Sequence, residues 1–204
     1  LPRPLYRVDA DPGSEGRCYE TDAFVHGDSR LVLEGLADRL EGKMRVDAQF
    51  QSDLQAAKSA AVASLVDGLG PYSTLVEALQ AAVGQNFNWV RDVTVSNSTW
   101  GNRYLYLFDP KAGVHALGGG IGQGLAMGIG AAIGSAQAHT GKKTYCLAGD
   151  GGFILNLGEL ATAVQEKANM VIILMNDKGY GVIKNIQDAQ YGWRRHYFDL
   201  HTPD

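Results

Sequence analysis

Two short apolar runs that each end in an acidic, glycine-containing turn place the strongest constraint on how this chain can fold. The run YCLA, residues 145–148, stops at GDGG, residues 149–152, and the run VIILM, residues 171–175, stops at NDKG, residues 176–179. The segment between them has helical character. A strand, helix, strand order predicts two parallel strands, because a right-handed crossover returns the second strand beside the first. The two turns should then emerge at the same edge of a sheet.

Asp150 and Asp177 would lie together at this edge, beside backbone N–H groups that glycine leaves accessible. Carboxylate oxygens suit Mg²⁺, which usually keeps substrate phosphate among its ligands. We therefore expect Asp150, Asp177 and the backbone carbonyl of Gly179 to bind Mg²⁺. The N–H groups of Gly151 and Gly152 would face a diphosphate. The same pattern also fits two ordinary strand-end turns in which aspartate acts as a cap.

Composition indicates a soluble globular protein. The chain has 204 residues, and 45% of them are hydrophobic, which is enough for a buried core. Lys and Arg number 18 against 22 Asp and Glu, and there is no basic run, so we expect no nucleic-acid binding. Cys18 and Cys146 lie far apart and suggest neither disulfides nor zinc. No apolar run approaches the roughly 20 residues of a membrane helix, so we expect a cytoplasmic protein that does not enter a membrane.

The chain divides into three parts by pattern. Residues 1–42 predict two short strands and a helix, too few strands to stand alone, and we expect the end of a central domain. Residues 43–67 are polar and alanine-rich, which predicts a mostly helical linker. Residues 68–204 predict a further domain with a helix from about Ser73 and a strand from Val90 to Val95. The expected fold is α/β, with three layers, α/β/α, around a mainly parallel sheet.

Glycine is concentrated in LGGGIGQGLAMGIGAAIGS, residues 117–135, where helical spacing begins at about Gly122. No register of this segment supplies G-x-G-x-x-G, which disfavours a nicotinamide or flavin Rossmann site. GKK at residues 141–143 lacks the hydroxyl residue and the upstream glycine of a P-loop, which disfavours nucleotide triphosphate hydrolysis. The hydroxyl-rich segment SNSTW, residues 96–100, fits either a phosphate contact or an ordinary loop.

The two glycine segments, in this order, resemble the cofactor signature of thiamine-diphosphate enzymes, in the group of acetolactate synthase, benzoylformate decarboxylase and pyruvate decarboxylase. The resemblance covers nearly the whole chain, with residues 1–42 similar to the end of the group's central domain and 68–204 similar to most of its diphosphate-binding domain. It implies thiamine diphosphate bound through Mg²⁺, a 2-oxo acid substrate, and lyase or transferase activity as a decarboxylase or carboligase. It leaves FAD binding by the central domain open.

The resemblance also implies roles for residues matched by position. Asp150 and Asp177 match the metal ligands, and Gly179 matches the donor of a backbone oxygen. Ile121 matches the apolar residue that bends the cofactor, and the carbonyl of Gly119 matches the acceptor for its aminopyrimidine. The expected cofactor-binding residues are Gly119, Gly120, Ile121, Gly149, Asp150, Gly151, Gly152, Asp177, Gly179, Tyr180, Gly181 and, as a phosphate contact, Ser98.

Two departures from the family pattern concern single residues. Asp177 stands where asparagine is usual, and its extra charge should tighten metal binding while repelling diphosphate slightly. Ala126 replaces a common proline, which we interpret as a packing difference.

A third departure is larger. In the family, a glutamate from the pyrimidine-binding domain of a partner subunit activates the cofactor, so we expect no catalytic residue in this chain, no turnover by the chain alone, and a homodimer or homotetramer. The alternative is a non-catalytic module of the same fold that binds a phosphate ligand or serves assembly.

Overall fold

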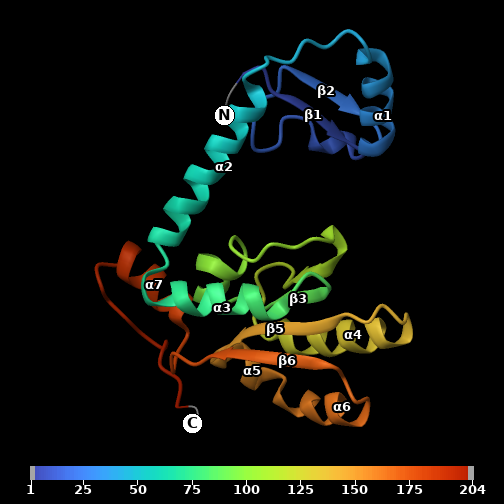
Figure 1. Cartoon of the computed structure of the whole chain (residues 1–204). Helices are drawn as coiled ribbons and strands as arrows, with labels where there is room; N and C mark the ends of the chain where they lie inside the picture. Colours follow the sequence, from blue (N-terminus) through green and yellow to red (C-terminus); the bar gives the residue numbers. More distant parts are fainter. Residues whose placement is uncertain (1–2, 202–204) are drawn as a thin grey trace. The chain divides into compact units, whose positions relative to one another are not determined.

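The computed structural model describes residues 3–201 and divides the chain into two compact units that meet between Ala56 and Ala57. The first unit contains strands β1 (Tyr6–Asp9) and β2 (Ala23–His26), which pair in parallel, and helix α1 (Ser29–Leu40) (Figure 1). The carboxylate of Asp28 accepts the N–H of Leu31 at 3.1 Å and so caps the start of α1, as its place before the helix predicts. These elements confirm the two strands and the helix expected within 1–42.

Helix α2 (Phe50–Asp67) crosses the boundary between the units, and none of its residues is buried. The boundary lies inside the segment 43–67. The interpretation of that segment as a linker, and of residues 1–42 as the end of a central domain, stays a prediction.

The second unit is built on a four-stranded parallel sheet with the strand order β4-β3-β5-β6. Its strands are β3 (Phe87–Arg91), β4 (Gly113–His115), β5 (Lys143–Gly149) and β6 (Met170–Met175). Gly149, the last residue of β5, lies opposite Met175, the last residue of β6. The two acidic turns that follow these strands therefore emerge at one edge of the sheet, as predicted.

One face of the sheet packs against α3 (Ser73–Val83). Alternate side chains of β3, Phe87 and Trp89, form a buried cluster there with Leu147 of β5 and with Val76 and Val83 of α3. Side chains alternate across a strand, so the residues between these ones face the other way.

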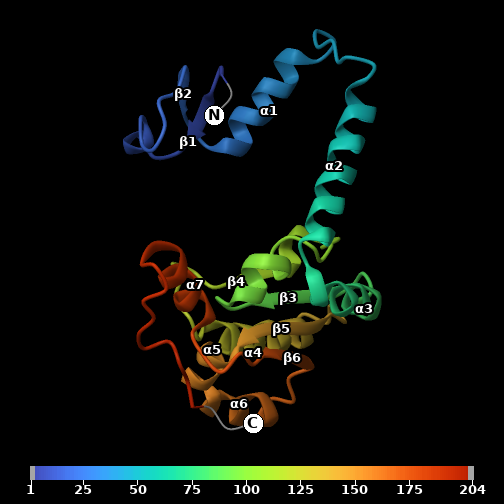
Figure 2. The ribbon, with the colours of Figure 1, turned by 90° about the vertical axis from the view of Figure 1, so that its left-hand side faces the viewer.

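The opposite face packs against α4 (Gln123–Gln137), whose small residues allow a close approach. A Cβ at Gly128 would lie 3.2 Å from the Cβ of Cys146 and 3.1 Å from the Cε of Met170. Helices thus cover both faces of the sheet (Figures 1 and 2), which confirms the predicted three-layer α/β class.

Three details of the second unit differ from the sequence predictions. The strand predicted at Val90–Val95 is wrong in position, because β3 ends at Arg91 and the chain turns away at Asp92. Strand β4 has no strong sequence signal and was not expected. The helix between the acidic turns is broken into α5 (Asp150–Leu155), a 3₁₀ turn (Leu157–Glu159) and α6 (Leu160–Gln165). Helix α7 (Gly181–Gln190) follows the second turn.

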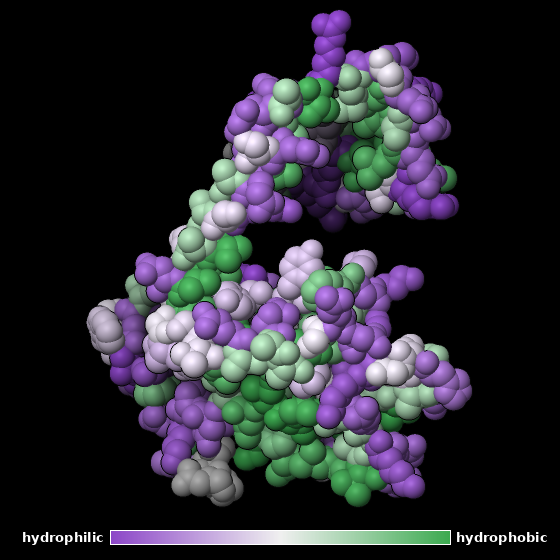
Figure 3. Space-filling view, in the orientation of Figure 1, coloured by the Kyte–Doolittle hydropathy of each residue, from purple (hydrophilic) through white to green (hydrophobic). Residues whose placement is uncertain are grey.

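Apolar side chains gather on one surface of the second unit, over β6 and α5 (Figure 3). Exposed large residues from these elements are Ile154, Leu155, Val171 and Leu174. β6 is an edge strand of the described sheet, with a hydrogen-bonded neighbour on one side.

Candidate functional site

A cavity of about 550 Å³ opens at the carboxyl edge of the sheet, where ligand sites of parallel α/β folds usually lie. Its volume is in the usual range for a small-molecule site. Four segments contribute to it: the chain after β3, the glycine loop before α4, the turn from β5 into α5, and the turn from β6 into α7. The lining residues are Val93, Thr94, Val95, Gly119, Gly120, Ile121, Gly149, Asp150, Gly151, Gly152, Asp177, Gly179, Tyr180, Gly181, Val182, Ile183 and Ile186.

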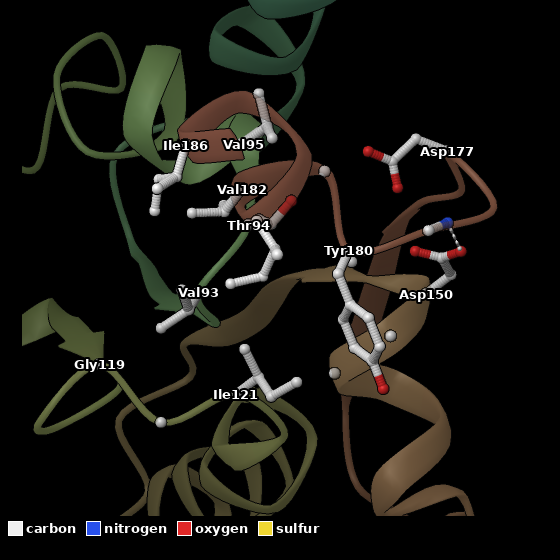
Figure 4. A pocket seen from close by; sticks show the side chains of 17 residues that line it. Val93, Thr94, Val95, Gly119, Ile121, Asp150, Asp177, Tyr180, Val182 and Ile186 are labelled. Atoms are coloured by element: carbon white, nitrogen blue, oxygen red, sulfur yellow. Dashed lines mark hydrogen bonds between the residues drawn. The ribbon is translucent and has the colours of Figure 1, made fainter. Parts of the chain in front are cut away.

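Asp150 joins the two acidic turns. Its side chain is buried, with 4% of the residue exposed, and its Oδ2 accepts the backbone N–H of Gly179 at 3.1 Å (Figure 4). Because Gly179 follows β6 and Asp150 follows β5, this bond fixes the two turns against each other. Asp150 also lines the cavity.

Asp177 lies beside Asp150 at the same end of the cavity (Figure 4). Partial burial raises the pKa of Asp177 above the ordinary aspartate value, and the charge of Asp150 raises it further. Two carboxylates so close together repel each other, and a bound cation would relieve that repulsion. Among residues 3–201 no cluster of three or more His, Cys, Asp or Glu side chains could hold a metal. A cation held by this pair would take its remaining ligands from backbone oxygens and from a bound phosphate.

Glycines at this end leave no room for side chains. A Cβ at Gly151 would lie 2.8 Å from the Cε1 of Tyr180, and one at Gly179 would lie 2.7 Å from the carbonyl oxygen of Phe198. A Cβ at Gly181 would overlap the Oδ2 of Asp177. The backbone of both turns is packed tightly enough that only glycine fits, which explains the glycines around each aspartate.

The glycine loop before α4 forms another wall of the cavity. Gly119 has φ of +72°, a left-handed conformation that glycine adopts at low cost. The side chain of Gln123 holds the loop by bonding the N–H of Leu117 at 3.1 Å and the carbonyl of Gly120 at 3.0 Å. Ile121 stands on this loop with 37% of the residue exposed, and it projects into the cavity (Figure 4).

The cavity has an apolar end that sequence reasoning missed. Val93 and Val95 follow β3, and Val182, Ile183 and Ile186 lie on α7. Figure 4 shows one end of the space surrounded by the side chains of Val93, Val95, Val182, Ile186 and Ile121, while Asp150 and Asp177 occupy the other end. Val93 and Val95 fall within the strand predicted at Val90–Val95. The aspartate between Arg91 and Val93 is the signal that could have ended that strand sooner.

Ser98 lies outside this cavity. It belongs to a π-helical turn (Asn97–Gly101), and its hydroxyl lies 3.4 Å from the carbonyl of Thr94. It lines a neighbouring hollow that also contacts Val95 and Val182. The structure thus brings together the other expected cofactor-binding residues and leaves Ser98 apart from them.

Comparison with known proteins now adds to this geometry. A family model described as "Thiamine pyrophosphate enzyme, C-terminal TPP binding domain" matches residues 94–204; thiamine pyrophosphate is another name for thiamine diphosphate. Over 188 residues, the chain is 29% identical to the acetolactate synthase isozyme 1 large subunit of Escherichia coli. The aligned region covers 92% of this chain and 33% of that protein. It is 30% identical over 182 residues to a probable 2-ketoarginine decarboxylase of Pseudomonas aeruginosa, covering 89% of this chain and 32% of that protein.

The crystal structure of benzoylformate decarboxylase from Polynucleobacter necessarius has the same fold. The structural match covers 98% of this chain and 36% of the decarboxylase chain, with a TM-score of 0.72 and 18% sequence identity. The chain spans about a third of the length of the curated relatives named above. Within the described residues, none of the helices has the length and hydrophobicity needed to cross a bilayer. Because the family model matches more than half of the sequence, the chain belongs to the thiamine pyrophosphate enzymes, as a member of their C-terminal TPP-binding domain family.

Proposed function

We propose that this chain binds thiamine diphosphate through Mg²⁺ as part of a 2-oxo acid enzyme of the decarboxylase or acetolactate synthase type. The observation that carries the proposal is the two-ended cavity, with paired carboxylates at one end and apolar side chains at the other. A cofactor with a metal-bound diphosphate and two flat rings has the complementary shape. The family match over residues 94–204 includes most of the cavity lining and supports this assignment.

At the acidic end, Asp150 and Asp177 would hold Mg²⁺ together with the backbone carbonyl of Gly179. The two carboxylates fit this role because a divalent cation offsets their mutual repulsion, and Mg²⁺ accepts phosphate oxygens as its remaining ligands. Gly151 and Gly152 carry no side chain that would keep a diphosphate away from the backbone. These residues would therefore anchor the cofactor by its charged end.

At the apolar end, Ile121 and Val93 would pack against the rings of the cofactor and exclude water from them. We propose that the carbonyl of Gly119 accepts a hydrogen bond from the aminopyrimidine, because Gly119 lies in the cavity wall two residues before Ile121. When bound, thiamine diphosphate supplies an electron sink for a 2-oxo acid that loses carbon dioxide. This chain would orient the rings without taking part in proton transfer.

The activating glutamate would come from the pyrimidine-binding domain of a partner subunit, in a homodimer or homotetramer. The apolar surface over β6 and α5 supports an association of subunits, since large exposed apolar areas mark interfaces. The Escherichia coli relative is a large subunit by name, which supports a multi-chain enzyme. A cytoplasmic location is also part of the proposal.

Calorimetric titration of the full-length protein tests this function. Thiamine diphosphate should bind in the presence of Mg²⁺, and binding should be lost when a chelator removes the metal. Asp150→Ala should also abolish binding, whereas the exposed Asp38→Ala, on α1, should leave it unchanged. Equal binding of thiamine diphosphate and inorganic pyrophosphate would favour the alternative of a phosphate-ligand module, and no binding of either would refute the proposal.

A further inference from the structure

Gly122 is held at both of its polar backbone atoms by side chains from other segments. Its N–H lies 3.0 Å and 3.2 Å from the two carboxylate oxygens of Asp92, to which it donates. Its carbonyl accepts the Nδ2 amide of Asn156 at 2.6 Å. Gly122 has φ of +89°, and a Cβ there would lie 3.2 Å from the Cβ of Leu155, so no other residue fits easily. The peptide groups on both sides of Gly122 are thus fixed in place.

Asp92 is itself rigidly anchored. It is fully buried, and its own N–H donates to the carbonyl of Leu147 on β5 at 2.8 Å. Its carboxylate also accepts the N–H groups of Val93 at 2.7 Å and Gly124 at 3.2 Å. Backbone donors at the start of a helix favour a negative charge, and here they satisfy a carboxylate that burial would otherwise make costly.

These bonds connect three walls of the cavity. Ile121 directly precedes Gly122, and Val93 directly follows Asp92, so the bond between Asp92 and Gly122 joins the glycine loop to the segment after β3. A Cβ at Gly152 would lie 2.7 Å from the Oδ2 of Asp92 and 3.2 Å from the nitrogen of Gly122. The turn from β5 into α5 therefore packs directly on this bond.

Helix capping accounts for only part of this arrangement. Gly122 is the residue before α4, so its N–H lies outside the hydrogen-bond ladder of the helix, yet it donates to both oxygens of Asp92. Asn156 comes from the end of α5 and bonds the carbonyl of the same residue. Because Asp92 bonds the N–H of Gly122 and Asn156 bonds its carbonyl, the two side chains fix the glycine loop as well as the start of α4.

We propose that Asp92 and Asn156 are positioning residues that hold Ile121 at the apolar end of the cofactor cavity. Neither residue lines the cavity itself. They act through Gly122, on the ring end of the site, while Asp150 and Asp177 hold the diphosphate end. This inference rests on the proposed binding of thiamine diphosphate.

Two ligands separate the ends of the site experimentally. We would titrate thiamine diphosphate and inorganic pyrophosphate, each with Mg²⁺, into the full-length protein and its variants by calorimetry. Asn156→Ala should weaken thiamine diphosphate binding by about 10-fold or more, the loss expected when a positioning hydrogen bond is removed, and leave pyrophosphate binding unchanged. Asp92→Asn keeps the shape of the side chain but removes its charge. It should likewise weaken thiamine diphosphate binding and leave pyrophosphate binding unchanged. Asn86→Ala is the matched control, because its side chain bonds the carbonyl of Thr140 near the amino ends of β3 and β5.

The outcomes are distinguishable. If the wild-type protein binds neither ligand, the proposed function itself fails. If the wild type binds thiamine diphosphate and both variants bind it equally well, the positioning role is overturned. An equal loss of both ligands in the variants, with a lowered melting temperature, would show a general structural role and would also overturn it.

Discussion

Asp177 lies beside Asp150 at the ends of neighbouring parallel strands, and burial together with the Asp150 charge raises the pKa of Asp177. A carboxyl with a raised folded-state pKa contributes stability below its ordinary pKa of about 3.9 and loses that contribution as the pH rises through the folded value. We therefore predict that Asp177→Asn raises the melting temperature of the metal-free protein by a few degrees at about pH 7, and that the gain shrinks toward about pH 4. Thermal unfolding in the presence of a chelator measures this.

With saturating Mg²⁺ and thiamine diphosphate, the wild type should instead have the higher melting temperature of the two. The wild type would then gain more stability than Asp177→Asn, since it offers the metal one more charge. A variant with the same melting temperature as the wild type under all of these conditions would show that the two carboxylates do not interact.

Ile121→Ala should weaken thiamine diphosphate binding by about 10-fold to 50-fold, because the shortened side chain loses apolar contact with the bound rings. Ile121→Leu keeps the volume and should change the affinity little. Competition with thiamine diphosphate measures the affinity for pyrophosphate. That affinity should be unchanged in Ile121→Ala if the variant loses only contacts with the rings of the cofactor. Equal affinities of Ile121→Ala and the wild type would place the rings elsewhere.

Two glycines of α4 should respond to alanine in opposite directions. A Cβ at Gly124 would lie 2.6 Å from the Cβ of Asp92, so Gly124→Ala should destabilise the fold by about 1–3 kcal/mol. Gly134 lies on the same helix with open space around it, and Gly134→Ala should stabilise by about 0.5–1 kcal/mol because alanine loses less backbone entropy. Urea denaturation compares the two. The same sign for both variants would contradict the packing of α4 against Asp92.

The two thiols should differ in reactivity. Burial, and secondarily the charge of Asp92, raises the pKa of Cys146 to about 12, and its Sγ donates to the carbonyl of Gly124. Cys18 is exposed. Because the thiolate is the reactive form, a thiol reagent at about pH 8 should label Cys18 in the native protein and Cys146 only after denaturation. Mass spectrometry of the labelled protein identifies the site, and rapid native labelling of Cys146 would contradict its burial.

The sequence predicted the parts of the fold that depend on local pattern. The apolar runs before Asp150 and Asp177 predicted two parallel strands, and strand pairing then places both turns at one edge. The helix starts predicted at about Ser73 and Gly122 agree closely with α3 and α4, whereas the helix predicted between the two acidic turns is broken. The resemblance added the glycine loop with Ile121, and the structure places that loop in the same cavity as the aspartates.

The positioning of the loop could not be predicted in the same way. Asp92 sits between Arg91 and Val93, inside the strand predicted at Val90–Val95. The bond from its backbone to Leu147 and the approach of Gly122 show that the strand has ended. Asn156 lay within an expected helix, and the break after α5 frees it to reach Gly122. Both contacts join residues far apart in the chain, which local periodicity does not report.

The edge strand β6 has a consequence for handling the protein. Its backbone N–H and C=O groups on the outer side have no strand partner among the described residues, and Val171 and Leu174 leave apolar side chains exposed along it. Such an edge is a template for β-pairing between molecules. Expressed as an isolated domain, the chain should tend to aggregate through β6, and a lysine at position 171 or 174 would be the first change to try in making it soluble.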